Sequence, residues 1–497
     1  MKRKKKTSQK PLNIVPSKAE QLTAFQPLLS AEEFAALQVE VEKSLPPAIR
    51  LNPLKATAEL AQALSARYGW TLTPIPFCDE GYRVQVNDGL GVSAALEHRI
   101  GQYYIQEAAS MLPVALFDIN AVDDGLTLDL AASPGGKTTH IVARQNDRGL
   151  VMANDSSQGR IQALKVVLQH WGATNTAVTR FAGEKFGAWF PNTFDRALID
   201  APCSMQGLRT AESHDERPVT DKESRALAQR QTALLTSALQ AVKVGGQVVY
   251  STCTLLPGED EGVVEAVLSK FGNTVELVDI SPKLPYPAPG IQQLDGQAYQ
   301  ADMSKVVRLW PHRYQTAGFF ACLLQKTGDL DLKTIEAPTH SMEAAGFNEF
   351  SYSESEKFAR DFKSFTGYDL STYLQAHQRT LVKRDARVFL FPRLLLEQFR
   401  SLPVQSAGML LGEWEGDVFI PSHEWVLRFG AQCVDCLVEL DDEAFARFCQ
   451  GDDLEGYTDQ LNSKSEIGVV MDRSGRVAGR GRVMPDRLKN LSSRQLR

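Results

Sequence analysis

The sequence has few cysteines, and it has no long apolar run. Seven cysteines are spread over 497 residues, and an odd number in so long a chain does not indicate a disulfide framework. No apolar stretch approaches the roughly 18 residues that a membrane-spanning helix requires. The N-terminal MKRKKKTSQK has no apolar segment behind it, so it lacks the pattern of a secretory signal. These absences predict a reduced, soluble, cytoplasmic protein without a membrane partner.

Positive charge is scarce in the body of the chain. The whole sequence has 54 basic and 60 acidic residues and a net charge of −6, but residues 11–470 alone carry −18. Residues 1–10 hold six basic groups, and residues 471–497 hold eight. This distribution excludes uniform coating of a polyanion and permits local contacts with nucleic acid, because attraction to phosphate depends on where cations cluster. Two solvated tails explain the charge equally well, and 413–459, with 13 acidic and 2 basic residues, is not expected to face RNA.

What the sequence does contain is a pattern of short apolar runs that alternate with amphipathic helices. Its 43% hydrophobic and 23% charged residues suffice for ordinary cores, and the length suggests about three domains of about 150 residues. The alternation predicts an α/β fold with a parallel sheet. The predicted strands are 126–131, 149–153, 176–179, 195–200, 246–251 and 318–324.

A glycine-containing turn follows the first of these strands. LDLAASPGGKT (128–138) reads as a strand, a turn of small residues and the start of a helix, whose free N–H groups can face a ligand. The spacing matches neither the dinucleotide fingerprint nor the P-loop. Asp155, after the second strand, is placed to accept hydrogen bonds from ribose hydroxyls. The unit therefore suggests a cofactor that contains a nucleoside, although a plain tight turn explains the loop alone nearly as well.

Two cysteines follow two other strands of the same sheet. Cys203 comes after Asp200-Ala201-Pro202, and Cys253 lies in Ser251-Thr252-Cys253-Thr254. Because parallel strands end at the same edge, we expect both thiols and the Asp200 carboxylate to converge beside the glycine turn. A lone cysteine is more often a small buried hydrophobic residue, but two at strand ends favour a functional interpretation.

The motifs LDLAASPGGKT, DAPCS and STCTLLPGEDE together resemble the RNA cytosine-C5 methyltransferases of the Nol/Nop/Sun family. The resemblance implies a Rossmann-like class I methyltransferase core with a mostly parallel seven-stranded sheet. It also implies a small N-terminal α+β domain and a C-terminal α+β, PUA-like RNA-binding region. The expected division is a basic disordered tail (1–18), an N-terminal α+β RNA-binding domain (19–100), the core (101–327), a linker with a small α/β region (328–400) and a PUA-like domain with a basic C-terminal strip (401–497).

The same resemblance implies the chemistry of the site. S-adenosylmethionine would be the methyl donor, and Cys253 would add to C6 of a cytosine so that C5 becomes nucleophilic. Asp200 would hydrogen-bond the base, Cys203 would assist breakdown of the adduct, and Lys137 would favour the thiolate. The residues implied in cofactor binding are Ala131, Ala132, Ser133, Pro134, Gly135, Gly136, Lys137, Asp155, Arg160 and Asp200.

Three departures from the family pattern concern the ligand sites. Ala182 stands where an acidic residue commonly contacts the adenine side, and Glu184 is a candidate substitute. Met205 follows Ser204 where the pattern has glycine, so we expect it to narrow or reshape the base pocket. The expected Arg-x-x-Pro stretch is not in register, since Arg209 and Arg217 lie elsewhere.

The implied partner is an RNA, which must be unstacked at the target base, and we expect 16S ribosomal RNA and a monomeric enzyme. A tRNA substrate and an RNA-binding assembly protein with impaired catalysis remain alternatives. A DNA methyltransferase is less consistent, because its nucleophile would be the Pro-Cys thiol. Cys433-x-x-Cys436 lacks a second pair unless Cys449 and His423 complete a zinc site, so we expect core cysteines and no metal.

Overall fold

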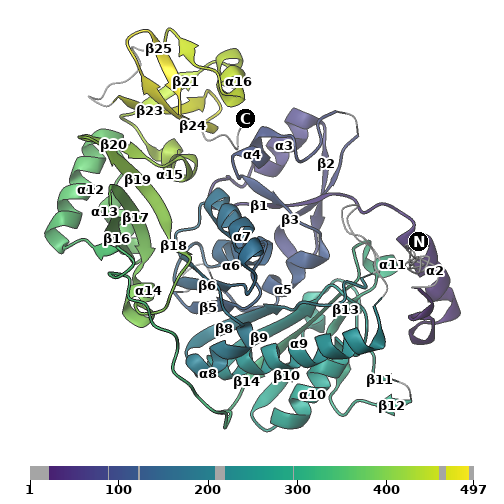
Figure 1. The fold of residues 1–497 in the computed structure, drawn as a ribbon. Coiled ribbons are helices and arrows are strands. Elements are labelled where there is room, and N and C mark those ends of the chain that lie inside the picture. The colour runs from purple at the N-terminus through teal and green to yellow at the C-terminus, as the bar shows by residue number, and fades with distance from the viewer. Residues whose placement is uncertain are drawn as a thin grey trace, which may run out of the picture.

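The computed structural model of the protein describes residues 22–87, 89–120, 124–207, 219–294, 296–457 and 466–491. The predicted basic tail at 1–18 lies outside these residues, as do Arg209 and Arg217. Figure 1 shows a central region built around one large sheet, an N-terminal sheet beside it, and a C-terminal region that ends in a separate small sheet. Within the described part of the chain, no helix combines the length and apolarity needed to cross a bilayer.

The N-terminal region is a four-stranded antiparallel sheet. Its order is β2 (Thr71–Ile75), β3 (Cys78–Gln85), β1 (Ala48–Leu51) and β4 (Tyr103–Ile105). Leu60 and Leu64 of α3 (Leu60–Tyr68) pack in the core of this unit, and the helix ends at Gly69, whose φ of 69° suits glycine. Because β4 pairs with β1, the sheet continues past the predicted boundary at 100/101, which is placed too early.

The helix α2 (Ala31–Val41) packs against the central region. Ser30 and Glu33 form a capping box that starts the helix. Leu37 and Val41 pack against Leu255 and Trp310, next to the segment that carries Cys253. The segment after residue 22 therefore supports the central region as well as the N-terminal sheet.

The central sheet confirms the predicted methyltransferase topology. The strand order is β10 (Val275–Val278), β14 (Phe319–Lys326), β9 (Val242–Thr252), β8 (Phe194–Asp200), β5 (Leu126–Asp129), β6 (Leu150–Asn154) and β7 (Thr176–Thr179). The strands from β9 to β7 are parallel, and β14 is antiparallel to both of its neighbours. Two short antiparallel strands that the sequence analysis did not predict, β13 (Val307–Leu309) and β18 (Ser406–Ala407), extend this sheet to nine strands.

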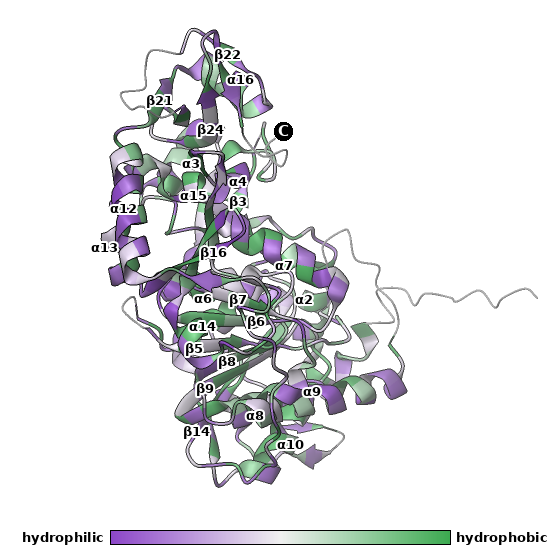
Figure 2. Cartoon of the chain, turned by 60° about the vertical axis from the view of Figure 1, so that its left-hand side comes forward, coloured by the Kyte–Doolittle hydropathy of each residue, from purple (hydrophilic) through white to green (hydrophobic). Residues whose placement is uncertain are grey.

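Helices cover both faces of the central sheet. Along β6, Leu150 and Met152 belong to one hydrophobic cluster and Val151 to another, as expected for a strand that is buried on both sides. Figure 2 shows hydrophobic residues on the central strands and hydrophilic residues on outer surfaces such as α9 and α12. The helices of this region are α5 (Leu112–Ala115), α6 (Gly136–Arg144), α7 (Gln158–Trp171), α8 (Phe186–Trp189), α9 (Asp221–Ala241), α10 (Glu261–Phe271) and α11 (Pro311–Tyr314), whereas the short α4 (Leu96–Arg99) contacts β4 of the N-terminal sheet. A two-stranded hairpin, β11 (Gln293–Leu294) and β12 (Gln297–Ala298), lies apart from the main sheet.

The C-terminal region contains two five-stranded sheets. The first comprises β15 (Asn348–Glu349), β16 (Arg379–Arg384), β17 (Arg387–Pro392), β19 (Met409–Glu415) and β20 (Val418–Pro421). The second comprises β21 (Leu437–Leu440), β23 (Ile467–Asp472), β24 (Val477–Val483), β25 (Arg487–Asn490) and β22 (Leu454–Glu455). Their helices are α12 (Tyr352–Thr366), α13 (Leu370–Ala376), α14 (Arg393–Gln398), α15 (His423–Phe429) and α16 (Asp442–Gln450). The predicted division at 400/401 is corrected, because β17 pairs with β19 and the boundary would cut that sheet.

A buried polar junction joins the central and C-terminal regions. Asp147, which is fully buried, accepts hydrogen bonds from Arg428 Nη1 at 2.5 Å and from the Tyr373 hydroxyl at 3.0 Å. Arg379 donates to the Asp147 carbonyl and to Thr174 Oγ1. Burial alone would raise the pKa of Asp147, but Arg428 and Arg379 lower it below its ordinary value. The buried Asp147 carboxylate of the central region and the arginines of the C-terminal region therefore stabilise the contact between the two regions.

The arginines of the basic C-terminal strip make intramolecular contacts. Arg482 pairs with Glu415 and Arg487 with Asp453, both in the acidic stretch 413–459. Arg476 pairs with Asp472 and with Glu97 of the N-terminal region. Arg476, Arg482 and Arg487 therefore offset negative charge within the fold and are less available to RNA phosphates than the sequence alone indicates.

Candidate active site

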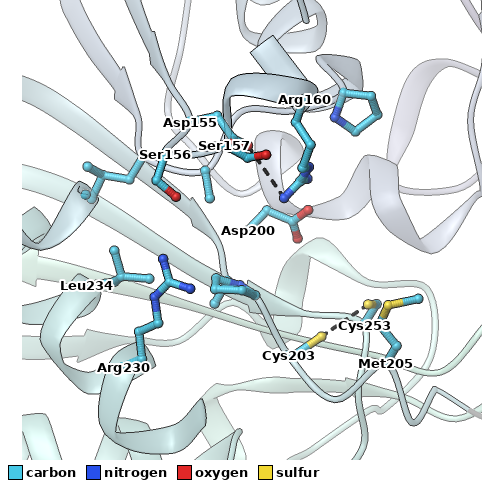
Figure 3. A pocket seen from close by; sticks show the side chains of 16 residues that line it. Asp155, Ser156, Ser157, Arg160, Asp200, Cys203, Met205, Arg230, Leu234 and Cys253 are labelled. Carbon is cyan, nitrogen blue, oxygen red and sulfur yellow. Dashed lines mark hydrogen bonds and ion pairs between the residues drawn. The ribbon is translucent and has the colours of Figure 1, made fainter. Parts of the chain in front are cut away.

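The carboxyl ends of the parallel strands surround a cavity of about 620 Å³. It opens where the strand order reverses, with β6 on one side of β5 and β8 on the other, which is the position at which open α/β sheets bind ligands. Figure 3 shows its side chains converging from β6 and α7, from the ends of β8 and β9, and from α9. The cavity is lined by Leu130, Ala131, Pro134, Asp155, Ser156, Ser157, Arg160, Gly183, Asp200, Ala201, Pro202, Cys203, Met205, Arg230, Leu234 and Cys253.

The glycine turn forms one wall of this cavity. Gly135 has a φ of 118°, and a Cβ there would lie 2.9 Å from Val167 Cγ1 of α7. A Cβ on Gly136 would lie 3.0 Å from Tyr104 Cε1 of the N-terminal sheet. Side chains of α7 and of the N-terminal sheet therefore leave little room for a Cβ at these two positions. The helix α6 begins directly after the turn.

Asp155 stands at the end of β6, as predicted, and is almost completely buried. Its carboxylate accepts the backbone N–H of Ser133 at 3.3 Å and that of Ser157 at 2.8 Å. Arg160 Nη1 lies 3.5 Å from Asp155 Oδ2, and the arginine side chain is half exposed (Figure 3). Asp155 thus ties the glycine turn to the start of α7, and the structure places both predicted residues at the cavity.

Lys137 and Asp200 form an ion pair beside the thiols. Lys137 Nζ lies 2.7 Å from Asp200 Oδ2, and the Ser251 hydroxyl donates to Asp200 Oδ1 at 3.1 Å. Lys137 projects from the first turn of α6, whereas Asp200 and Ser251 end neighbouring strands. The sheet and the helix therefore fix both charges without a mobile loop.

The two cysteines lie in contact, with Cys203 Sγ 3.2 Å from Cys253 Sγ (Figure 3). The hydrogen bond from Cys203 lowers the pKa of Cys253, and the Lys137 charge acts in the same direction against the effect of burial. The same bond and burial raise the pKa of Cys203 above its ordinary value. The geometry therefore favours a Cys253 thiolate that accepts a hydrogen bond from a protonated Cys203.

Glu259, which the sequence analysis did not single out, positions the segment after Cys203. It is completely buried and accepts hydrogen bonds from Ser204 N, Ser224 Oγ and Gln231 Nε2 at 3.0 to 3.1 Å. The acidic GEDE run after Cys253 contained the only available signal, but nothing in it indicated which carboxylate turns inward. Glu259 links this segment to α9 through Ser224 and Gln231.

Asp129, another residue that the sequence analysis missed, lies buried at the end of β5. Its Oδ2 accepts a hydrogen bond from Thr138 Oγ1 at 2.7 Å, while its Oδ1 has no partner among the described residues. Burial raises the pKa of Asp129 to about 7, and the Thr138 hydrogen bond opposes that rise. A buried carboxylate oxygen without a partner is a place at which a ligand donor can bind.

Glu184, the predicted substitute for the acidic residue absent at Ala182, pairs with an arginine of α9. Arg230 Nε donates to Glu184 Oε1 at 2.9 Å, and Arg230 lines the cavity together with Gly183. Glu184, the predicted substitute, is therefore engaged by an arginine that the sequence analysis did not identify. In Figure 3, Arg230 and Leu234 extend from α9 toward the cavity opposite Ser156.

Cys433 and Cys436 are buried in the apolar cluster that also contains Trp425 and Phe429. Cys449 packs in a different cluster. Within the described residues, the one group of three potential metal ligands is Cys78, Glu80 and His140, so Cys433 and Cys436 are not part of such a group.

Comparison with known proteins assigns the family. The family described as 16S rRNA methyltransferase RsmB/F matches residues 117–325, and the N-terminal domain of 16S rRNA methyltransferase RsmF matches residues 19–108. The chain is 32% identical over 470 residues to ribosomal RNA small subunit methyltransferase F of Shewanella oneidensis, covering 94% of both chains. It is 32% identical over 476 residues to the protein of the same name from Aeromonas hydrophila, again covering 94% of both. The protein belongs to the RsmF family.

A solved structure agrees with this assignment. The methyltransferase homolog protein from Pyrococcus horikoshii is 28% identical, with a TM-score of 0.52, and the match covers 62% of this chain and 99% of that one. As an RsmF-family protein, the chain is an S-adenosylmethionine-dependent RNA methyltransferase.

The cavity fits S-adenosylmethionine in size. Its volume of about 620 Å³ is in the range of cofactor pockets. The cofactor carries a sulfonium and an ammonium group, and the carboxylates of Asp155 and Asp200 line the cavity together with Arg160 and Arg230. The cavity therefore has room for the cofactor and offers two carboxylates to its positive groups.

Proposed function

We propose that the protein methylates C5 of a cytidine in 16S ribosomal RNA through a covalent bond between Cys253 and C6 of the base. The observation that carries this proposal is the contact between Cys253 and Cys203 beside the Lys137–Asp200 pair. A cytosine ring is a poor nucleophile at C5, and a thiolate that adds to C6 makes C5 electron-rich. The paired thiols supply that thiolate and a second sulfur in reach of the same carbon atoms.

The residues divide the work of binding the donor. The turn 131–136 faces its amino-acid portion, Asp155 accepts from its ribose hydroxyls, and Arg160 orients Asp155. When bound, S-adenosylmethionine supplies an electrophilic methyl group. Asp200, at the end of β8, lies between this portion of the cavity and the thiols.

The charged residues support addition of the thiolate. Cys253 attacks C6, and its electron pair becomes the new sulfur–carbon bond while the ring electrons move toward C5 and N3. Asp200 accepts a hydrogen bond from the exocyclic amino group of the base, and Lys137 offsets the negative charge of Asp200. Lys137 also favours the Cys253 thiolate before it attacks.

Cys203 acts after methyl transfer. Once Cys253 is bonded to carbon, the thiolate whose hydrogen bond keeps Cys203 protonated is gone, so Cys203 can lose its proton to solvent. It then accepts the C5 proton, the C5–H electrons restore the ring double bond, and Cys253 leaves as a thiolate. The hydrogen bond at 3.2 Å is restored at the same time.

The position of the methyl group tests the proposal in cells. Bisulfite sequencing of 16S ribosomal RNA from cells with and without the gene is expected to show one protected cytidine that disappears on deletion. The wild-type gene should restore it and Cys253→Ala should not, although the variant protein should bind S-adenosylmethionine normally. A cytidine that stays methylated in the deletion strain, or full restoration by Cys253→Ala, would contradict the proposal.

The division of labour between the thiols has its own test. Cys203→Ala is expected to accumulate a protein–RNA adduct that survives denaturing electrophoresis, whereas Cys253→Ala should form none. Cys322→Ala is the matched control, because that cysteine is buried on β14 away from the cavity lining. An adduct trapped by Cys253→Ala would exchange the two roles.

A further inference from the structure

Met205 has an unusual backbone conformation next to the thiols. Its φ is 59°, in the left-handed region where residues other than glycine pay about 1 kcal/mol. Its side chain is 42% exposed and lines the cavity, so burial in the protein does not offset this cost. Where a chain keeps a strained residue at a ligand site, the strain points to a role toward the ligand.

The segment around Met205 is fixed on both sides. Ser204 N donates to Glu259 at 3.0 Å, and the Ser204 hydroxyl contacts Thr254 Oγ1 at 3.0 Å. On the other side, the carbonyl of Gly207 accepts Gly318 N at 2.7 Å. A Cβ on Gly207 would lie 2.6 Å from the Cys253 carbonyl oxygen, so the backbone at Gly207 packs closely against the segment that carries Cys253. Met205 therefore lies between two residues whose backbones are hydrogen-bonded to neighbouring segments.

The Met205 side chain lines the cavity beside the thiol that we propose as the nucleophile. Figure 3 shows the Met205 thioether beside Cys253, on the opposite side of the thiol pair from Asp200. A base with C6 at the Cys253 sulfur must lie flat within van der Waals reach of the groups around that sulfur. A thioether is polarizable and packs well against planar rings.

We propose that Met205 is the apolar contact for the target base, and that its thioether packs against the face of the unstacked ring and holds C6 over Cys253. This inference rests on the proposed function and adds the residue that orients the base. It explains why the chain tolerates methionine at a position that favours glycine. The variant Met205→Gly separates the two effects, because it removes the contact and also relieves the backbone strain.

The experiment compares Met205→Gly and Met205→Leu with the wild type. Met205→Gly is expected to raise the KM for 16S RNA about tenfold and to slow adduct formation in the Cys203→Ala background by a similar factor. Its melting temperature should be unchanged or higher and its affinity for S-adenosylmethionine unchanged. Met205→Leu, which keeps an apolar side chain, should stay within about threefold of the wild type. Val244→Ala, which truncates another exposed apolar residue, is the control and should change nothing.

The remaining outcomes are decisive in different ways. Wild-type kinetics in Met205→Gly, or faster methylation by it, would overturn the inference, because the side chain would then be neutral or obstructive. A lower melting temperature together with a lower cofactor affinity in Met205→Gly would overturn the inference and indicate a structural role for Met205. Absence of methylated cytidine and of any Cys203→Ala adduct with the wild-type Met205 would instead refute the proposed function.

Discussion

Lys137 sets the charge balance around the thiols. Its ammonium lies 2.7 Å from Asp200 and lowers the pKa of Cys253, whereas Asp200 raises it. Both carboxylate and thiolate depend on this single cation at the start of α6. Removing it leaves two groups of like charge side by side, and such an arrangement disfavours ionisation of the weaker acid, the thiol.

The variant Lys137→Met should therefore raise the pKa of Cys253. Alkylation by iodoacetamide requires the thiolate, so the rising limb of its rate against pH should move to higher pH, and the rate at pH 7 should fall. Peptide mass spectrometry can assign the modified cysteine. Lys222→Met on the exposed start of α9 is the control. An unchanged profile in Lys137→Met would show that Lys137 does not control the thiol.

The sequence predicted the residues that follow strand ends and could not predict those that reach the site from elsewhere. Cys203, Cys253 and Asp200 converge because parallel strands end at one edge. Glu259 and Arg230 come together with the site only through the packing of α9, which no local pattern encodes. The positive φ of Met205 was equally invisible, because methionine gives no signal for the left-handed region.

Glu259 links the segment after β8 to α9. Its carboxylate accepts three hydrogen bonds without exposure to solvent. Hydrogen bonds to a charged acceptor contribute about 1.5 to 3 kcal/mol each, so this group makes a large contribution to holding Ser204 against α9. Because Ser204 lies between Cys203 and Met205, the position of both residues depends on this hydrogen bond.

The variant Glu259→Gln should lower the methylation rate about tenfold and leave the affinity for S-adenosylmethionine within about twofold, because the donor contacts lie on other elements. Isothermal titration and single-turnover kinetics measure the two effects. Glu276→Gln, an exposed position on β10, is the control. An equal loss of donor affinity would show that Glu259 supports the whole cavity rather than this one segment.

The elements of the parallel sheet were predicted closely, and the antiparallel additions were missed. The predicted strand 195–200 corresponds to β8 (Phe194–Asp200), and its apolar run is long enough to be recognised. β18 (Ser406–Ala407) is a two-residue strand of small residues that pairs with β7 from more than 200 residues away. Such a strand forms because its backbone pairs with a neighbouring strand, and its two residues are too few to show an alternating hydrophobic pattern.

At the scale of the whole molecule, Asp147 determines how the regions hold together. Domain boundaries predicted at 100/101 and 400/401 fell inside sheets because composition reports linkers but not which strands pair. Asp147, Arg379 and Arg428 lie far apart in sequence, and their contact joins the central sheet to the C-terminal region. The charge excess of the body is likewise reduced in the fold, where Arg482 and Arg487 meet acidic partners.

The variant Asp147→Asn should lower the free energy of unfolding by about 3 to 5 kcal/mol, because the buried Arg428 loses its ion-pair partner and Arg379 loses a nearby negative charge. The pKa of Asp147 is lowered in the fold, so its contribution is present above pH of about 4 and is lost as the pH falls through the folded-state value. Urea unfolding at pH 7 and pH 3 measures both effects, and the difference in stability between the two proteins should be smaller at pH 3 than at pH 7. Asp361→Asn, on the exposed face of α12, is the control. Equal stability of Asp147→Asn and wild type at pH 7 would show that the Asp147 junction does not stabilise the fold.

The same junction limits how C-terminal regions can be exchanged between relatives. A chimaera that takes α13 to α15 from another protein must bring arginines at the places of Arg379 and Arg428, or the buried Asp147 keeps only its hydrogen bonds to uncharged donors such as Thr174. Conversely, a donor region that carries both arginines needs an acceptor core with the carboxylate. The two regions therefore depend on each other, and compatible exchanges can be recognised from the residues at positions 147, 379 and 428.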